Sequence, residues 1–211
     1  MTKKLNIFLM RHAKPDLPHG GKLYYGQTDY PLCEEGERLA EQIGEKIKNV
    51  TFDGIFSSTL LRARHTAELT VPKHKNKIQT VKDLSEINVG DWEGKSYDEV
   101  RTKWEELYDA RGVSFDSVAP PNGESFLDLQ KRTVPAFEKI LSRYAEGNLL
   151  VVAHGGVIWT IICHYFNFVL NDIFFYPMDY CGIHMLERTD SFMRLIRYNW
   201  NEHLDVTKTG Y

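Results

Sequence analysis

The stretch that decides the fold is Leu149-Leu150-Val151-Val152-Ala153-His154-Gly155-Gly156. Its five consecutive apolar residues are typical of a strand buried on both faces, as in a parallel sheet. The His-Gly-Gly that follows and the apolar segment 157–166 predict a turn into a buried helix. The N-terminal run Leu5–Met10 has the same character and ends at Arg11-His12. Two such strands indicate the centre of an α/β sheet.

The rest of the chain alternates between strand-like and helix-like segments. The patterns predict helices over 34–48, 60–69, from Ser96 through Val100, Trp104 and Leu107, and over 125–144. They predict strands over 52–56 and 78–81, and a closing antiparallel pair over 182–187 and 192–198. We expect Pro135 to kink or divide its helix, and the hydroxyls of residues 57–59 to cap the helix at 60–69. This alternation predicts a single domain, residues 1–211, built as a three-layer α/β/α sandwich with a mostly parallel central sheet.

Composition excludes several classes of protein. The 211 residues carry 26 Lys+Arg and 29 Asp+Glu, a net charge of −3 that argues against a nucleic-acid-binding surface. No apolar run approaches the roughly 18 residues of a membrane helix, and the run 5–10 is too short for a signal peptide. The three cysteines form no Cys-x-x-Cys pair and predict no disulfide framework, which favours a reducing, cytoplasmic setting.

Basic residues gather where the predicted strands end. Arg11 and His12 follow the first strand, Arg62 follows the second by six residues, and His154 follows the strand at 149–153. The carboxyl ends of parallel strands share one edge of a sheet, where ligands bind. The helix that starts near Gly155 adds backbone N–H groups to that edge. Such a cluster of donors predicts an anionic ligand, either a phosphate or a carboxylate.

Several motifs in one order resemble those of a known family. Arg11-His12-Ala13 is similar to the Arg-His-Gly signature of the histidine phosphatase (phosphoglycerate-mutase-like) superfamily. Further matching segments are Gly26–Asp29 with Leu32 and 34–36, Ser57–Ala63 with 66–67, Leu84–Glu86 with 90–94, Gly123–Ser125, and Val151–Val157. The compact length and the Gly-Gln-Thr-Asp-x-Pro-Leu stretch at 26–32 most resemble the small α-ribazole-phosphatase-type members.

The resemblance implies a role for each matching residue. His12 would be the nucleophile that becomes phosphohistidine, and Glu86 the general acid that protonates the leaving oxygen and later activates water. Arg11, Arg62, His154 and the backbone of Gly155 would bind the phosphate oxygens. Asp91 and Glu93 compete with Glu86 for the role of the acid. The resemblance implies no metal and no cofactor.

Departures from the family pattern lie in the first loop. Ala13 replaces the usual glycine, and Pro18 stands about where many members carry an asparagine that contacts phosphate. Lys14, His19 and Gln27 are the candidate replacements, and Lys14 and Gln27 are the candidate substrate-binding residues. Other side chains have structural readings. Glu124 is either a stabiliser of the following helix or a functional residue, Arg132 is a charge on a helix face, and Tyr24, Tyr25 and Trp92 are pocket or core residues.

Three functions are compatible with these motifs. The favoured one is a phosphomonoester hydrolase that acts on a small phosphorylated metabolite, with α-ribazole phosphate as the candidate, and binds neither nucleic acid nor membrane. The first alternative is a cofactor-dependent phosphoglycerate mutase, which uses the same machinery but is expected to be longer before the Gly-Glu-Ser segment. The second alternative is an inactive binding module. Retention of His12, Glu86 and His154 argues against it.

Overall fold

Both faces of the strand at the centre of the sheet are buried, as its apolar run predicts. A computed structural model describes residues 3–200, apart from the side chain of His19. In it, Leu149, Val151 and Ala153 pack into one hydrophobic cluster, and Leu150 and Val152 pack into another on the opposite face. The alternation follows from the two-residue period of a strand, and it places a helical layer on each side of the sheet.

Six strands form one sheet in the order β3-β2-β4-β1-β5-β6. They are β1 (Leu5–Arg11), β2 (Gly54–Ser58), β3 (Ile78–Val81), β4 (Gly147–Ala153), β5 (Ile183–Arg188) and β6 (Met193–Trp200). The first four strands are mutually parallel, whereas β5 pairs antiparallel with β1 and β6 antiparallel with β5. The predicted mostly parallel sheet with a closing antiparallel pair is confirmed.

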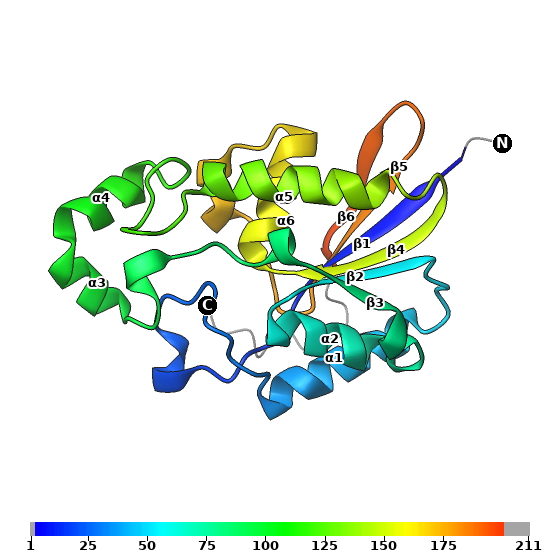
Figure 1. Cartoon of the computed structure of the whole chain (residues 1–211), viewed down its shortest axis with the longest axis horizontal. Helices are drawn as coiled ribbons and strands as arrows, with labels where there is room; N and C mark the ends of the chain where they lie inside the picture. Colours follow the sequence, from blue (N-terminus) through cyan, green and yellow to red (C-terminus); the bar gives the residue numbers. More distant parts are fainter. Residues whose placement is uncertain (1–2, 201–211) are drawn as a thin grey trace.

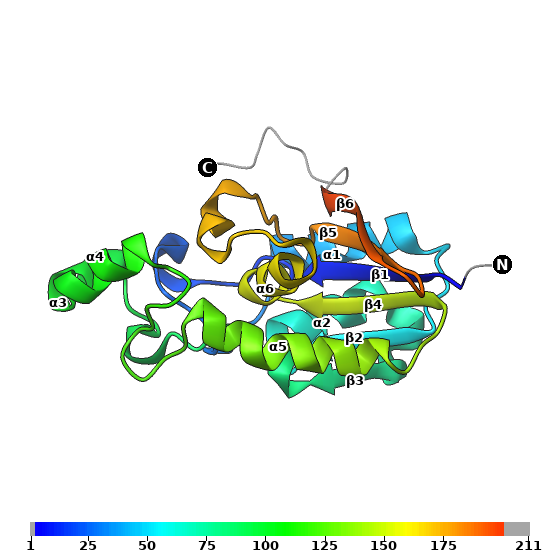
Figure 2. The ribbon, with the colours of Figure 1, turned by 90° about the horizontal axis from the view of Figure 1, so that it is seen from above.

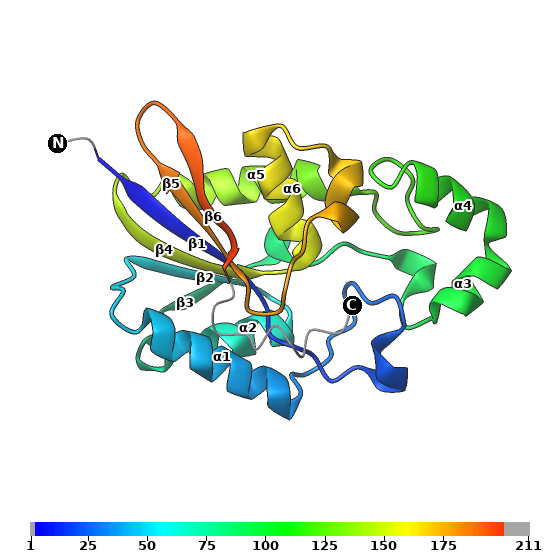
Figure 3. The same cartoon turned by 180° about the vertical axis from the view of Figure 1, so that it is seen from behind.

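Helices cover both faces of this sheet. Helices α1 (Glu34–Ile47) and α2 (Leu61–Thr70) lie on one face, and α5 (Phe126–Leu141) and α6 (Gly155–Phe166) on the other (Figures 1 and 2). The three-layer sandwich is therefore confirmed. Helices α3 (Tyr97–Lys103) and α4 (Glu105–Val113) project beyond the carboxyl ends of the parallel strands (Figure 3). Short 3-10 turns at 18–21, 72–77, 82–84, 90–92 and 170–175 complete the described elements.

Two local predictions are wrong, and the division that the sequence allowed for at Pro135 does not occur. The helix predicted from Ser96 is divided at Trp104, whose backbone leaves the helical region and whose ring lies 6.5 Å from that of Trp92. Helix α5 is not divided, because it continues through Pro135 to Leu141. The cap of α2 is Leu60, which has no side-chain hydrogen bond to offer.

Candidate active site

The register between β1 and β4 brings two histidines together. Arg11 pairs with Ala153, and the backbone N–H of His12 donates to the Ala153 carbonyl over 2.9 Å. The rings of His12 and His154 consequently lie 5.0 Å apart between centroids, and both side chains are buried. The predicted meeting of the two strand ends is thus present in the structure.

His12 is held as a neutral imidazole with one free nitrogen. Its Nδ1 lies 2.7 Å from the Ala13 carbonyl oxygen, which only accepts, so the ring proton sits on Nδ1. Burial lowers the pKa of His12 well below its usual value, and the nearby Arg62 and Arg11 lower the pKa further. Nε2 therefore carries a lone pair at neutral pH, as a nucleophile requires.

Two arginines lie beside this ring. The guanidinium of Arg11 donates to the Met178 carbonyl and lies 4.1 Å from the centroid of the Tyr180 ring. Arg62 is fully buried and donates to the carbonyls of Thr28 and Gly26 over 2.9 and 2.5 Å. Within the described part of the chain, nothing accepts from the buried Nε of either arginine. A fully buried and a partly buried cation, each with an unused donor, make this position strongly attractive to an anion.

His154 adds a further buried donor. Ser58 Oγ accepts from the backbone N–H of Leu60 over 3.2 Å, so its own proton is available for His154 Nε2 at 2.8 Å. The ring proton of His154 then sits on Nδ1, which no described residue accepts. Burial and the neighbouring Arg62 lower the pKa of His154 well below its usual value. A neutral donor of this kind fits an oxygen of a phosphoryl group.

Among the three competing carboxylates, Glu86, Asp91 and Glu93, it is Glu86 that lines the cavity. Its Oε1 accepts from its neighbour, the backbone N–H of Ile87, over 2.8 Å, and its Oε2 from that of Gly156 over 3.2 Å. The competing Glu93 accepts instead from the backbone of Gly26 and Gln27, over 2.9 and 2.6 Å. Glu86 thus lies at the cavity, whereas Glu93 anchors the loop at Gly26 and Gln27.

The second competing carboxylate, Asp91, also lies outside the cavity lining. It accepts from the side-chain amide of Asn122 over 3.1 Å. The sequence motif alone favoured Glu86 over Asp91, and the geometry supports that choice.

Replacing Gly156 by alanine is expected to displace the Glu86 carboxylate. A Cβ at Gly156 would lie 2.5 Å from Glu86 Oε1, closer than van der Waals contact allows. We expect kcat/KM for alkyl phosphates to fall about 10-fold or more, since small misplacements of a catalytic group are costly. Gly112→Ala in α4 is the control, because a Cβ at Gly112 would meet nothing within 4 Å and Gly112 does not line the cavity. Equal losses in steady-state assays of the two variants would contradict this reading.

A cavity of about 680 Å³ opens beside these residues. Arg11, His12, Glu86 and Gly155 line it, and Arg62 and His154 lie buried behind them. The wall is apolar and comes largely from the segment that follows α6. Its apolar members are Leu39, Ile87, Phe126, Ile173, Phe174, Tyr176, Pro177 and Met178.

The two candidate substrate-binding residues are placed differently. Lys14 lines the cavity, but its ammonium forms an ion pair with Glu35 over 2.6 Å. Gln27 does not line the cavity and instead donates to the Glu86 carbonyl over 3.3 Å. Among the candidate replacements for the loop asparagine, the side chain of His19 lies outside the described residues. Lys14 therefore stays a candidate for substrate contact, whereas Gln27 positions the loop of Glu86.

Aromatic residues of the site divide between cavity and core. Tyr25 lines the cavity, and its hydroxyl lies 3.1 Å from that of Tyr180, which the sequence did not single out. Tyr24 packs on Trp92, with ring centroids 5.0 Å apart, and Trp92 is fully buried. No motif covers the chain after about residue 160. Tyr180 is therefore recognised only because the folded chain brings its segment back to the cavity.

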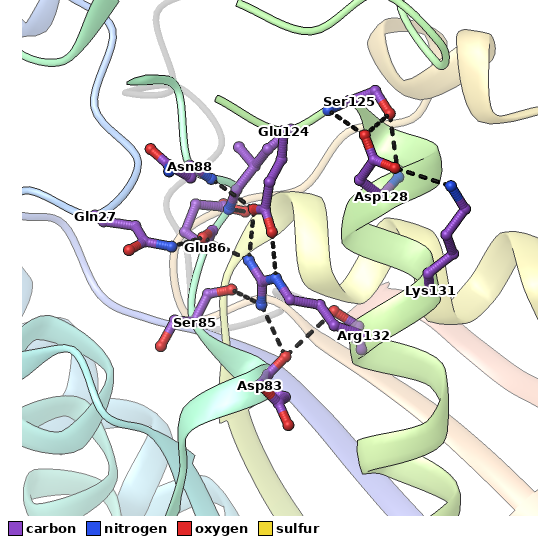
Figure 4. Close-up of polar contacts among 12 residues, drawn as sticks. Gln27, Asp83, Ser85, Glu86, Asn88, Glu124, Ser125, Asp128, Lys131 and Arg132 are labelled. Carbon is purple, nitrogen blue, oxygen red and sulfur yellow. Dashed lines mark hydrogen bonds and ion pairs between the residues drawn. The ribbon is translucent and has the colours of Figure 1, made fainter. Parts of the chain in front are cut away.

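Arg132 is not the solvated charge on a helix face that the sequence suggested. About four-fifths of its side chain is buried, and Glu124 pairs with it at 2.7 Å. Both side chains form hydrogen bonds to the backbone of the loop that carries Glu86 (Figure 4). The structure thus favours a role at the site for both residues.

Buried neutral histidines are expected to make stability depend on pH. Burial lowers the pKa of His184 to about 3, while the unfolded chain keeps a value near 6.5. Below pH 6.5 the unfolded state therefore binds more protons, and the free energy of unfolding falls by up to about 1.4 kcal/mol per pH unit for this residue. His184→Asn should show a shallower slope in denaturant titrations between about pH 4 and 6. An unchanged slope would contradict the assignment.

Residues 3–200 contain neither a cluster of metal ligands nor a membrane-spanning helix. No group of three or more His, Cys, Asp or Glu side chains in this range is arranged to hold a metal ion. No helix in the same range has the length and apolar character to cross a bilayer.

Comparisons with known proteins agree with this geometry. The chain is 30% identical over 162 residues to the adenosylcobalamin/alpha-ribazole phosphatase of Escherichia coli strain K12, covering 75% of this chain and 77% of that one. It is 36% identical over 170 residues to a 2,3-bisphosphoglycerate-dependent phosphoglycerate mutase of Nitrobacter winogradskyi, covering 77% and 81%. A crystal structure of a putative alpha-ribazole-5'-P phosphatase from Escherichia coli superimposes with a TM-score of 0.85 and 25% identity, covering 93% of this chain and 96% of that one.

The mutase comparison corrects one expectation. The same 170-residue alignment covers 77% of this chain and 81% of the mutase, so the two proteins have similar lengths. Length therefore does not separate the two activities here. The sequence model of the histidine phosphatase superfamily (branch 1) matches residues 7–201. Together with the strand-end histidines and arginines, this match shows that the chain belongs to the histidine phosphatase superfamily.

Proposed function

We propose that the chain is a phosphomonoester hydrolase that works through a phosphohistidine on His12. The observation that carries the proposal is a buried, neutral His12 between two arginines, at a cavity that Glu86 also lines. A nucleophile needs the free lone pair, the phosphoryl oxygens need the cations, and an alkoxide leaving group needs a proton. Each need is met by a residue at this one edge of the sheet.

Two chemical steps follow from this arrangement. His12 Nε2 attacks phosphorus, the ester P–O bond breaks, and protonated Glu86 delivers its proton to the leaving oxygen. A water molecule then attacks the phosphohistidine while the Glu86 carboxylate takes its proton. The P–N bond breaks and inorganic phosphate leaves. Arg11, Arg62 and His154 would hold the non-bridging oxygens throughout, where most of the transition-state charge lies.

The cavity wall favours a monophosphate with an apolar remainder. Among the described residues that line the cavity, Lys14 is the one lysine or arginine besides Arg11, and it is paired with Glu35. Asp179 adds a second carboxylate to the outer wall. A phosphoglycerate or bisphosphoglycerate carries further negative charge that this wall would repel. The names of similar proteins point to α-ribazole phosphate. This nucleotide-like ester has an aromatic base that the wall could cover.

The mutase stays the second candidate, because a mutase relative is 36% identical to the chain. A screen of phosphate esters separates the two activities. We expect phosphate release from α-ribazole phosphate and aryl phosphates, and little 2-phosphoglycerate from 3-phosphoglycerate plus 2,3-bisphosphoglycerate. Rapid interconversion of the phosphoglycerates with little phosphate release would overturn the proposal in favour of the mutase.

All three cysteines are free, which suits an enzyme of a reducing compartment such as the cytoplasm.

A further inference from the structure

Arg132 of α5 uses every donor it has, and three of its five hydrogen bonds go to the loop that carries Glu86. Its Nη1 donates to the carbonyls of Asp83 and Ser85, each over 2.9 Å, and its Nη2 to the carbonyl of Glu86 over 3.0 Å. Its Nε and Nη2 also donate to the two carboxylate oxygens of Glu124, over 2.7 and 2.9 Å (Figure 4). These contacts match the five N–H donors of a guanidinium.

Glu124 holds the other side of the same loop. Its Oε2 accepts from the backbone N–H of Asn88 over 2.8 Å, and its own backbone N–H donates to the Asn88 carbonyl over 2.8 Å. The pair therefore fixes the loop before and after Glu86. No helix or strand is assigned between the turns that end at Leu84 and begin at Gly90, so side chains must set the path of this segment.

Helix α5, which anchors this loop, packs against the helix that contacts the Glu86 carboxylate. Helix α5 buries Leu129 and Phe137 completely and packs against α6. The N-terminus of α6 supplies Gly156, whose N–H donates to the Glu86 carboxylate. The backbone of Glu86 is thus fixed from α5 and its carboxylate from α6, two helices that pack on each other.

The pair lies outside the cavity and contacts the loop of Glu86. Arg132 and Glu124 neutralise each other, their side chains are only 21% and 22% exposed, and neither lines the cavity. We infer that Arg132 and Glu124 are positioning residues for the reaction, which set the general acid Glu86 against the leaving oxygen. This inference rests on the proposed function, because it takes Glu86 as the acid.

The test is the dependence of kcat/KM on the leaving group. An alkyl phosphate such as glycerol phosphate needs a proton on its leaving oxygen, whereas 4-nitrophenyl phosphate releases a stable phenolate without one. We expect Arg132→Gln to lower kcat/KM about 10- to 100-fold for the alkyl ester and less than about 3-fold for the aryl ester. Arg132→Lys keeps the charge but has three donors in another geometry, so it should keep most of the selective loss.

Arg188 provides the matched control. It also bridges elements by donating to backbone carbonyls, those of Leu141 and Tyr144, but at the far end of α5. Arg188→Gln should lower the thermal midpoint without changing the ratio of the two kcat/KM values. A loss in Arg132→Gln that is equal for both esters, like that of a general loss of folded protein, would overturn the inference.

A reference variant keeps the two proposals apart. If Glu86→Gln is selective for alkyl esters and Arg132→Gln is not, the positioning role fails and the proposed function stands. If Glu86→Gln is not selective, the assignment of the acid fails, and the positioning inference fails with it. Should Arg132→Gln not fold, Arg132→Lys carries the same comparison with the same two outcomes.

Discussion

Replacing His12 by alanine is expected to abolish phosphate-ester hydrolysis, with a loss of kcat of about 10⁴-fold or more. No neighbouring side chain can replace it as the nucleophile. His154 engages Ser58 through Nε2, and the two arginines keep their protons at any working pH. The loss should extend to esters with good leaving groups, because the P–N bond has to form whatever the leaving group is.

The measurement combines turnover with detection of the intermediate. The wild-type protein, denatured rapidly during turnover at alkaline pH, should carry a phosphoryl mass on the peptide with His12, and His12→Ala should not. His65→Ala is the control, since this partly exposed histidine of α2 lies 3.9 Å from Glu37 and is absent from the cavity lining. Undiminished turnover by a folded His12→Ala variant would contradict the mechanism.

The fold follows from the sequence where burial alone determines it. The runs 7–10 and 149–153 are apolar at every position, so they had to lie between two covered faces. The break at Trp104 had no such local signal. Val100, Trp104 and Leu107 keep a helical spacing, and contact with the distant Trp92 decides the conformation of Trp104. Tertiary packing here overrides the local spacing of apolar residues, which by itself predicts a continuous helix.

The site divides in the same way. Arg11, His12 and His154 follow strands directly, so the topology of the sheet is enough to bring them together. Tyr180 could not be placed in advance. It comes to the site because the next residue, Cys181, adopts a φ of 57° and donates its N–H to the Arg11 carbonyl. A left-handed cysteine is uncommon, and no sequence pattern announces it.

Arg132 was misjudged for a related reason. Its position on α5 is compatible with a solvated charge. Only the return of the loop at 83–88 to the helix gives it three carbonyl acceptors, to which Glu124 adds two carboxylate oxygens. Glu124 was open between two readings. Its carboxylate accepts from Asn88 and pairs with Arg132, which favours the functional reading. Contacts between segments tens of residues apart are what local patterns do not contain.

Glu86→Gln is the second substitution with a large expected effect. The amide keeps the volume of the side chain, but its single oxygen can accept from only one of the two N–H groups, that of Ile87 or that of Gly156. It also has no proton to give at a useful pKa. General acid catalysis contributes about 10²- to 10⁴-fold, so kcat/KM for an alkyl phosphate should fall by that order. With 4-nitrophenyl phosphate the loss should be much smaller, because its leaving oxygen needs little protonation.

The ratio kcat/KM is the right quantity because it includes no step after the first irreversible one, which is transfer to His12 when the alcohol departs. Steady-state kcat also contains hydrolysis of the phosphohistidine, in which Glu86 would serve as the base, so its loss should be less selective. Asp91→Asn is the control, since this carboxylate has the same motif neighbourhood but accepts only from Asn122 among the bonds resolved here. An equal loss of kcat/KM on both esters would remove Glu86 from the role of acid. The selective loss, joined to an unchanged ratio in Asp91→Asn, would place the proton donor on Glu86, which alone among the three competing carboxylates lines the cavity.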